Sequence, residues 1–168
     1  MRSTMMFAAG LFAGLAVHVA IGAQRPDNGV QSANNGVVMM NHVAVAVPNL
    51  AEAVTYYTQK MGYREAFRAL DDKGQPRLVY LHVSRNTFIE LQPTNAQRPT
   101  GFNHYGLHVE DVAAAVARYR QAGLTVTDVN KSDTEAMLAN ITDPYMGRIE
   151  LAQLPPDSMH QKAIASWK

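Results

Sequence analysis

The chain contains two copies of one segment, and this internal repeat limits its possible folds more than any other feature. Residues 41–60 align with residues 103–122 at a constant offset of 62 positions. The identical pairs are Asn41/Asn103, His42/His104, Val47/Val109, Ala51/Ala113, Ala53/Ala115, Val54/Val116, Tyr57/Tyr119 and Gln59/Gln121. Further along, Ile89-Glu90-Leu91 matches Ile149-Glu150-Leu151 at an offset of 60. A collinear set that includes both a His and a Glu indicates two modules of the same architecture.

Each module has the pattern of one strand, one helix and then further strands. In the first module, residues 42–47 alternate as a strand does, and Asn49 can cap a helix that ends at Gly62. Three more strands are predicted over residues 63–70, 77–83 and 87–92. The second module repeats this order with Asp111 as the cap, a helix over 112–121 and later strands over 137–142 and 148–154. The sequence therefore predicts an α+β fold built from two tandem βαβββ modules.

The N-terminal segment, residues 1–23, has the layout of a secretory signal peptide. Arg2 precedes an apolar run over residues 5–21, and small residues follow at Gly22 and Ala23. An uncleaved membrane anchor is the alternative, because about 17 apolar residues is near the lower limit for spanning a bilayer. We expect cleavage near Ala23, export to the periplasm or out of the cell, and no attachment to the membrane afterwards.

The rest of the chain divides into a linker, one domain and a short tail. Residues 24–39 are rich in Asn, Gly and Gln, a composition typical of a flexible linker. The domain covers residues 40–156, with module one at 40–93 and module two at 102–155. Residues 157–168 are predicted to be a C-terminal tail.

The composition excludes several classes of function. Lys and Arg number 15 against 14 Asp and Glu, which gives a formal net charge of +1. No basic excess is therefore available to neutralise the phosphates of a nucleic acid. The chain has no cysteine, which excludes disulfides, thiolate metal sites and a cysteine nucleophile. Any metal ion must be held by His, Asp or Glu.

Strand alternation brings four potential metal ligands to one face of the sheet. Residues two apart in a strand share a face, and we expect the apolar face of each module to lie beneath its helix. The opposite, open face then carries His42, Glu90, His104 and Glu150. A single strand His is more often a surface residue, but here a His and a Glu recur at the same points of both modules. Two imidazoles and two carboxylates suit one divalent ion such as Zn, Ni, Fe, Mn or Co.

Two further residues are predicted to contact a small-molecule substrate. His108 shares the face of His104, and its alternative is a partly solvated strand residue with no ligand. Arg148 lies one strand step before Glu150, where it could bind an anionic group of the substrate or simply pair with a carboxylate.

Four stretches of the two modules form a known pattern: N-H-V-A-V-A-V-P-N-L-A-E-A-V-T-Y-Y-T-Q-K-M-G-Y, F-I-E-L, N-H-Y-G-L-H-V-E-D-V and D-P-Y-M-G-R-I-E-L. Over residues 40–155 the chain thereby resembles the vicinal oxygen chelate superfamily. That superfamily includes glyoxalase I, extradiol dioxygenases, methylmalonyl-CoA epimerase and the fosfomycin and bleomycin resistance proteins. The resemblance implies a curved mixed sheet that wraps a divalent ion, with His42, Glu90, His104 and Glu150 as its ligands.

The ligand set is most similar to that of glyoxalase I. This similarity implies a metal-dependent lyase or isomerase that acts on a small oxygen-chelating substrate through a metal-stabilised enediolate. It also implies Glu150 as the base, with Glu90 alternating between metal ligand and acid. One position departs from the glutathione-dependent members: Ala46 stands where they have an Arg that reaches the thiol cofactor.

Other activities of the superfamily remain open. Extradiol ring-cleaving dioxygenases hold iron with two His and one carboxylate, which His42, His104 and Glu150 match, although Glu90 would fill a position that those enzymes keep open. A resistance-type protein that binds a small molecule is the third possibility. The resemblance also implies a homodimer, because relatives often complete the metal site across a dimer interface and the apolar side of a small sheet needs cover.

Overall fold

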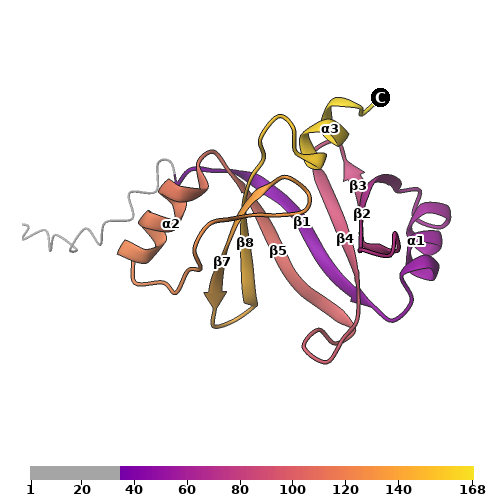
Figure 1. Cartoon of the computed structure of the whole chain (residues 1–168), viewed down its shortest axis with the longest axis horizontal. Coiled ribbons are helices and arrows are strands. Elements are labelled where there is room, and N and C mark those ends of the chain that lie inside the picture. Colours follow the sequence, from indigo (N-terminus) through magenta and orange to yellow (C-terminus); the bar gives the residue numbers. More distant parts are fainter. Residues whose placement is uncertain (1–34) are drawn as a thin grey trace, which may run out of the picture.

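The computed structural model describes residues 35–168, which form one eight-stranded mixed sheet with three helices (Figure 1). The predicted signal peptide and residues 24–34 of the predicted linker lie outside the described residues. The strands are β1 (Val37–Val47), β2 (Arg64–Leu70), β3 (Pro76–Ser84), β4 (Thr87–Pro93), β5 (Gly101–Val109), β6 (Asn130–Lys131), β7 (Met137–Asp143) and β8 (Gly147–Gln153). The helices are α1 (Leu50–Gln59), α2 (Val112–Gln121) and α3 (Met159–Ala165).

Each half of the sheet is one of the predicted modules. The strand order is β2-β3-β4-β1-β5-β8-β7-β6, so the first four strands of the chain form one half and the last four form the other. In both halves the first strand pairs in parallel with the last, β1 with β4 and β5 with β8. β1 and β5 lie antiparallel at the centre and join the two modules within one chain. The predicted fold of two tandem βαβββ modules is therefore confirmed.

The boundaries of the domain differ from the predicted ones at both ends. β1 begins at Val37, so the last three residues of the predicted linker (24–39) belong to a strand. The extra length arises from pairing, because Val37 lies opposite Val109 at the far end of β5. At the other end, the predicted tail (157–168) contains α3. Contacts with residues far away in the sequence fix both ends, and local composition does not show them.

The repeat gives α1 and α2 the same N-terminal cap. Asn49 Oδ1 accepts a hydrogen bond from the backbone N–H of Glu52 at 3.1 Å, and Asp111 Oδ1 accepts one from Ala114 at 3.0 Å. A cap of this kind satisfies one of the N–H groups that a helix leaves unpaired at its start. Both helices thus begin at equivalent points of the two modules.

α1 and α2 cover the outer face of the curved sheet, one for each module. Beneath α1 the buried apolar side chains are Val47, Val79, Leu81 and Leu91. The buried side chains Val112, Ala115 and Val116 of α2 pack on the strand residues Val109, Ile141, Ile149 and Leu151. Burial of this apolar surface fixes which face of each strand points outward. The alternate residues of the same strands therefore point to the inner face.

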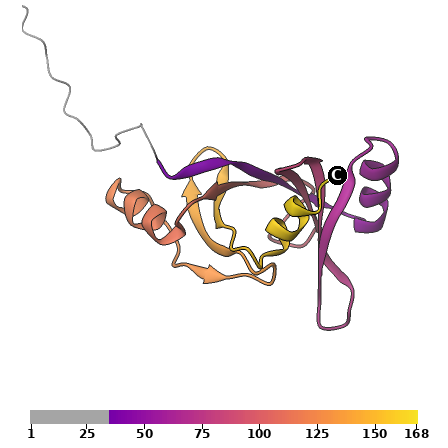
Figure 2. The same cartoon turned by 90° about the horizontal axis from the view of Figure 1, so that it is seen from above.

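α3 lies on the inner side of the curve (Figure 2). Ser158 caps it, with its Oγ accepting from the backbone N–H of Gln161 at 3.3 Å, and Ala163 packs with Tyr80 and Phe88 of module one. The helix thus covers part of the inner face, which the sequence analysis predicted to be open. Among residues 35–168, no helix combines the length and apolar character that crossing a bilayer requires.

Candidate metal centre

Four neighbouring strands bring the predicted ligands to one point on the inner face. His42 is on β1, His104 on β5, Glu90 on β4 and Glu150 on β8. The Nε2 atoms of the two His are 3.2 Å apart. Glu90 Oε2 lies 3.5 Å from Nε2 of His42 and 3.4 Å from Nε2 of His104, and the Glu150 oxygens lie 3.7 Å from the same two atoms. All four side chains come from one chain, so the cluster forms without a second subunit.

Two β-bulges set the orientation of the imidazoles. The pairing of β1 with β5 skips Asn41 on one strand and Asn103 on the other, which makes each an extra, bulged residue directly before a candidate ligand. Asn41 Oδ1 lies 2.9 Å from Nδ1 of His42, and Asn103 Oδ1 lies 2.7 Å from Nδ1 of His104. Because an amide oxygen only accepts, each Nδ1 carries the proton. Each ring therefore presents its Nε2 lone pair to the shared point.

The ring of His42 lies against Gly106, and a larger residue there would collide with it. A Cβ at position 106 would stand 2.1 Å from Cε1 and 2.5 Å from Nδ1 of His42. Gly106 pairs with His42 across the central strands, whereas its counterpart in the repeat, Ala44, pairs with His104. The two modules are thus not equivalent at this point, and only the second needs glycine.

Burial disfavours the charged form of every member of the cluster. His42 and His104 are fully buried, and Glu90 and Glu150 retain only 3% and 8% of their exposure. Burial lowers the pKa of His104 to about 3 and that of His42 well below its ordinary value. Burial raises the pKa of Glu90, and burial together with the charge of Glu90 raises the pKa of Glu150 to about 8. Burial thus outweighs the opposing effect of Arg148, whose charge lowers the pKa of both carboxylates.

A divalent cation fits this donor set. With both protons on Nδ1, the two Nε2 atoms face each other as acceptors and cannot hydrogen-bond to one another. Glu90 Oε2 is buried and has no hydrogen-bond partner among residues 35–168. One cation between them would satisfy both lone pairs and the carboxylate, and would offset the cost of burying them.

Three of the four residues have the spacing of a three-ligand site by themselves. The ligand atoms of His42, His104 and Glu150 all lie within 4.8 Å of one another. Glu90 stands beside this group, with Oε1 accepting from Gln92 Nε2 and a further hydrogen bond from Tyr80 stabilising its ionised form. The arrangement is thus two imidazoles and two carboxylates around one point, and Glu90 Oε2 lies slightly closer to both Nε2 atoms than the Glu150 oxygens do.

Arg148 lies at the border of the cluster. This position is expected, because Arg148 comes two residues before Glu150 on β8 and so shares its face of the strand. Its Nη1 donates to Asn140 Oδ1 at 3.2 Å, and its Nη2 donates to Asn103 Oδ1 at 3.0 Å. The same Nη2 lies 2.5 Å from Nδ1 of His104, and Nη1 lies 3.8 Å from Oε2 of Glu150. The guanidinium therefore sits at the edge of the candidate metal centre, against one ligand and close to another.

A polar cavity of about 270 Å³ opens onto the cluster and includes Glu90, Glu150 and Arg148 in its lining. His108 is not among its lining residues. It is partly buried on β5 and lies near His160, whose pKa is lowered to about 3 by burial first and by His108 second. A substrate contact by His108 stays a prediction.

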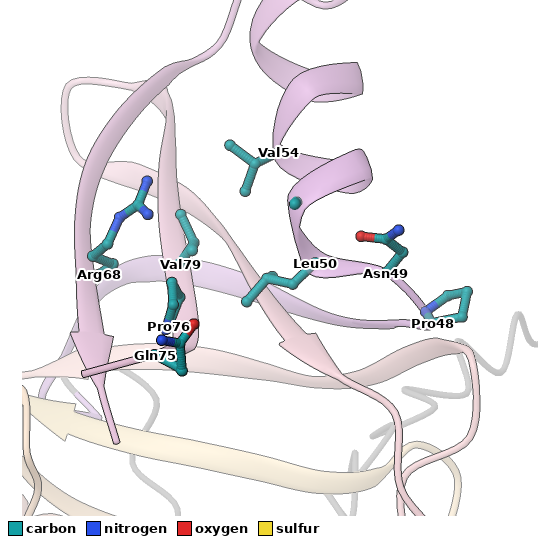
Figure 3. Close-up of a pocket in the computed structure, with 9 residues that line it drawn as sticks. Pro48, Asn49, Leu50, Val54, Arg68, Gln75, Pro76 and Val79 are labelled. Atoms are coloured by element: carbon teal, nitrogen blue, oxygen red, sulfur yellow. The ribbon is translucent and has the colours of Figure 1, made fainter. Parts of the chain in front are cut away.

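A larger cavity, of about 510 Å³, lies on the outer face between the start of α1 and β3 (Figure 3). Leu50 and Val54 of α1 face Val79 there. Its lining contains no His, Asp or Glu, and its one charged side chain, Arg68, is bound by Glu65 at 2.7 and 2.5 Å. The smaller cavity is therefore the one lined by candidate metal ligands, although the outer cavity has the greater volume.

The sequence analysis assigned no role to several residues that surround the cluster. Asn41 and Asn103 are identical residues at equivalent positions of the repeat, so the repeat could have indicated a shared role for them. His160 on α3 and Arg98 in the loop between β4 and β5 have no counterpart in the other module. No local pattern in the sequence singles out these last two.

Solved structures with a similar fold include several epimerases. The methylmalonyl-CoA epimerase of Mycobacterium tuberculosis superposes with a TM-score of 0.65 at 21% identity, over 74% of this chain and 93% of that one. The Streptomyces coelicolor methylmalonyl-CoA epimerase in complex with 2-nitronate-propionyl-CoA gives 0.61 at 18% identity, over 73% and 98%. A hypothetical protein of Bacillus halodurans gives 0.57 at 13% identity, over 69% and 94%. At these identities the similarity shows the fold alone.

The sequence itself also matches a known family. No curated protein matches this chain. Residues 41–139, more than half of the chain, match the Glyoxalase/Bleomycin resistance protein/Dioxygenase superfamily. This match begins within β1, ends within β7 and includes His42, Glu90 and His104. Together with the paired βαβββ modules, it establishes that the chain belongs to this superfamily, the vicinal oxygen chelate proteins.

Proposed function

We propose that the protein is a divalent-metal-dependent isomerase or lyase of the glyoxalase I type, which moves a proton on a carbon beside a chelated substrate oxygen. One observation carries this proposal: two imidazole Nε2 atoms and two buried carboxylates converge on one point that a cavity reaches. The epimerases among the similar structures are isomerases, which supports the same class of reaction.

The residues that would hold the ion are His42, His104 and Glu150, with Glu90 as the fourth. A divalent ion bound there would polarise a substrate carbonyl and make the neighbouring C–H more acidic. The two His would stay neutral and serve only as ligands, because Asn41 and Asn103 hold their remaining protons.

Glu150 is the better candidate for the base of the two carboxylates. One oxygen of Glu90 is held by Gln92, and its other oxygen points to the two His. Although both carboxylates line the cavity, Glu150 lies slightly farther from both Nε2 atoms and has Arg148 beside it at 3.8 Å. It is therefore placed to accept a proton from a substrate carbon, while Arg148 favours the return of the carboxylate to its ionised form.

The experiment follows exchange of the substrate C–H with deuterium from solvent. Metal-loaded protein is incubated in D2O with 2-oxoaldehyde–thiol adducts and with small 2-oxo and 2-hydroxy acids, and NMR records the loss of the C–H signal. Glu150→Gln retains an oxygen for the metal but loses the base, so we expect metal content to persist and exchange to fall by about 100-fold or more. The control is Glu52→Gln on α1, which changes an exposed carboxylate. Exchange at the wild-type rate in metal-loaded Glu150→Gln would contradict the assignment.

A ring-cleaving dioxygenase is the second candidate, because His42, His104 and Glu150 form a two-His, one-carboxylate group of the kind that iron oxygenases use. The position of Glu90 decides between the two functions, since a bound fourth carboxylate leaves too little room for both a catechol and oxygen. Oxygen uptake by the Fe(II)-loaded protein with catechol, without any C–H exchange, would favour the dioxygenase. Binding of small molecules without either reaction would favour a resistance-type protein.

A further inference from the structure

The cavity above the candidate metal centre has an excess of positive charge once the candidate ligands are set aside. Four basic side chains line it: Arg77, Arg98, Lys131 and Arg148. The one other acidic residue of the lining, Asp133, is paired with Arg77. Lys131 is paired with Glu135. Arg98 and Arg148 therefore remain as the two cations of the lining whose charge no acid outside the metal centre neutralises.

Arg98 is held in a fixed position at the rim of this cavity. Its backbone N–H and C=O are both hydrogen-bonded to Asn95, at 3.1 and 3.0 Å, and its Nε donates to the carbonyl oxygen of Pro93 at 2.9 Å. No carboxylate within the described residues forms an ion pair with it. The N–H groups of its two terminal nitrogens can therefore donate hydrogen bonds to a ligand that enters the cavity.

Arg148 needs a different acceptor once His104 serves as a ligand. When Nε2 of His104 binds a metal ion, Nδ1 carries the proton and donates it to Asn103 Oδ1. Arg148 Nη2, which lies 2.5 Å from that Nδ1, is also a donor and cannot hydrogen-bond to it. The remaining groups within reach are Asn103, Asn140 and the ligand carboxylate of Glu150. Each terminal nitrogen of Arg148 carries two N–H groups, and an anion in the cavity would accept from the one that Asn103 leaves over.

We propose that the substrate is a small molecule that bears an oxyanion group, bound by Arg98 and Arg148 while its other oxygens reach the metal centre. This inference rests on the proposed function and specifies its substrate class. The cavity volume of about 270 Å³ equals about nine water molecules at about 30 Å³ each, which limits the enclosed part to a small acid. The forked N–H donors of a guanidinium group match two oxygens of a carboxylate or of a phosphoryl group.

Titration calorimetry on the metal-loaded protein tests this proposal with malonate, its neutral analogue malonamide and inorganic phosphate. We expect malonate to bind, malonamide to bind at least about tenfold more weakly, and Arg98→Gln and Arg148→Gln each to weaken malonate binding by about tenfold or more. Arg85→Gln is the matched control, because it removes the same charge from the exposed β3–β4 turn. Tighter binding of malonate than of phosphate assigns a carboxylate, and the reverse order assigns a phosphoryl group.

Metal content is measured on every variant so that the two proposals fail separately. Metal-loaded protein that binds malonate no better than malonamide overturns the anion site and leaves the proposed function standing. Equal malonate affinity in wild type and Arg98→Gln also overturns the anion site. This result does not bear on the metal centre, because Arg98 is not a candidate metal ligand. A chain that binds no divalent ion contradicts the proposed function instead, and the same titration on that metal-free chain still tests the two arginines.

Discussion

At the scale of single residues, the asparagine before each His determines which nitrogen reaches the metal. Asn41 and Asn103 are bulged out of the central strand pair, and each accepts the Nδ1–H of the His that follows it. Without that acceptor an imidazole can rotate or change its tautomer. Partners of this kind typically affect metal affinity by about 10–100-fold.

We therefore expect Asn41→Ala and Asn103→Ala each to weaken binding of Zn or Ni by about 10–100-fold while the fold is kept. The measurement is competition with a chelating dye, with circular dichroism as the check on folding. Asn95→Ala, in the exposed loop between β4 and β5, is the control. Metal affinity equal to wild type in both variants would show that the two asparagines do not orient the ligands.

A second residue-scale prediction concerns the glycine against His42. Gly106→Ala would place a Cβ within 2.1 Å of the ring, so the ring must leave its position. We expect metal affinity to fall by about tenfold or more, because one ligand is displaced. Ala44→Gly, at the equivalent position of the first module, creates no such contact and should keep its metal. Full occupancy in Gly106→Ala would mean that His42 is not a ligand in this orientation.

At the scale of elements, the sequence predicted the two modules because the same local signals occur twice. Asn49 and Asp111 cap helices as expected, and the apolar alternation of β4 and β8 places Glu90 and Glu150 on the inner face. The bulges interrupt the alternation of β1 and β5, yet His42 still lies on that inner face. The clustering of the four predicted ligands could thus be foreseen.

Features that occur only once could not be foreseen in this way. Arg98 reaches the cavity through the conformation of the β4–β5 loop, which hydrogen bonds to Asn95 and Pro93 fix. α3 has no counterpart in the repeat, and packing on Tyr80 and Phe88 rather than a long local pattern holds it in place. Its buried His160 is therefore invisible in a repeat-based interpretation.

The environment of His160 on α3 leads to a prediction about how the stability of the fold depends on pH. Its ring lies among Phe67, Tyr80 and Phe88, and neither ring nitrogen has a hydrogen-bond partner in the part of the chain that the structure describes. Burial lowers its pKa from 6.5 to about 3. Between these pH values the unfolded chain binds a proton at His160 that the folded chain does not. The contribution of neutral His160 to the free energy of unfolding is therefore fully present above pH 6.5 and is lost as the pH falls toward 3.

His160→Phe removes both the unpartnered nitrogens and this titration. We expect the Tm of the variant to equal or exceed that of wild type at pH 7.5, and its advantage to grow at pH 5. Scanning calorimetry at the two pH values measures this difference. An advantage that shrinks on acidification would contradict the assigned direction of the pKa shift.

At the scale of the whole molecule, both halves of the metal centre come from one chain. β1 and β5 join the modules directly, so a dimer interface is not needed to complete the ligand set. The homodimer expected from the resemblance stays a prediction. Met40 on β1 and Phe102 on β5 are 50% and 48% exposed, and apolar side chains of this kind on central strands are candidates for such an interface.

The export of the protein is a prediction about its N-terminus. The layout of Arg2, the apolar run over residues 5–21 and Ala23 is typical of a cleaved signal peptide. N-terminal sequencing of protein recovered from the periplasm or the medium should therefore begin near Gln24. Recovery of the whole protein in the membrane fraction, with Met1 intact, would favour an uncleaved anchor instead.

The central claim is that His42 and His104, one from each module, hold a single divalent ion between them. Elemental mass spectrometry on protein purified without added metal tests it most directly, as the ratio of metal to chain. We predict about one ion per chain in wild type and in His108→Ala, and loss of that ion in both His42→Ala and His104→Ala, because each of these removes a ligand. Full metal occupancy in His42→Ala and His104→Ala would contradict the site and the function built on it.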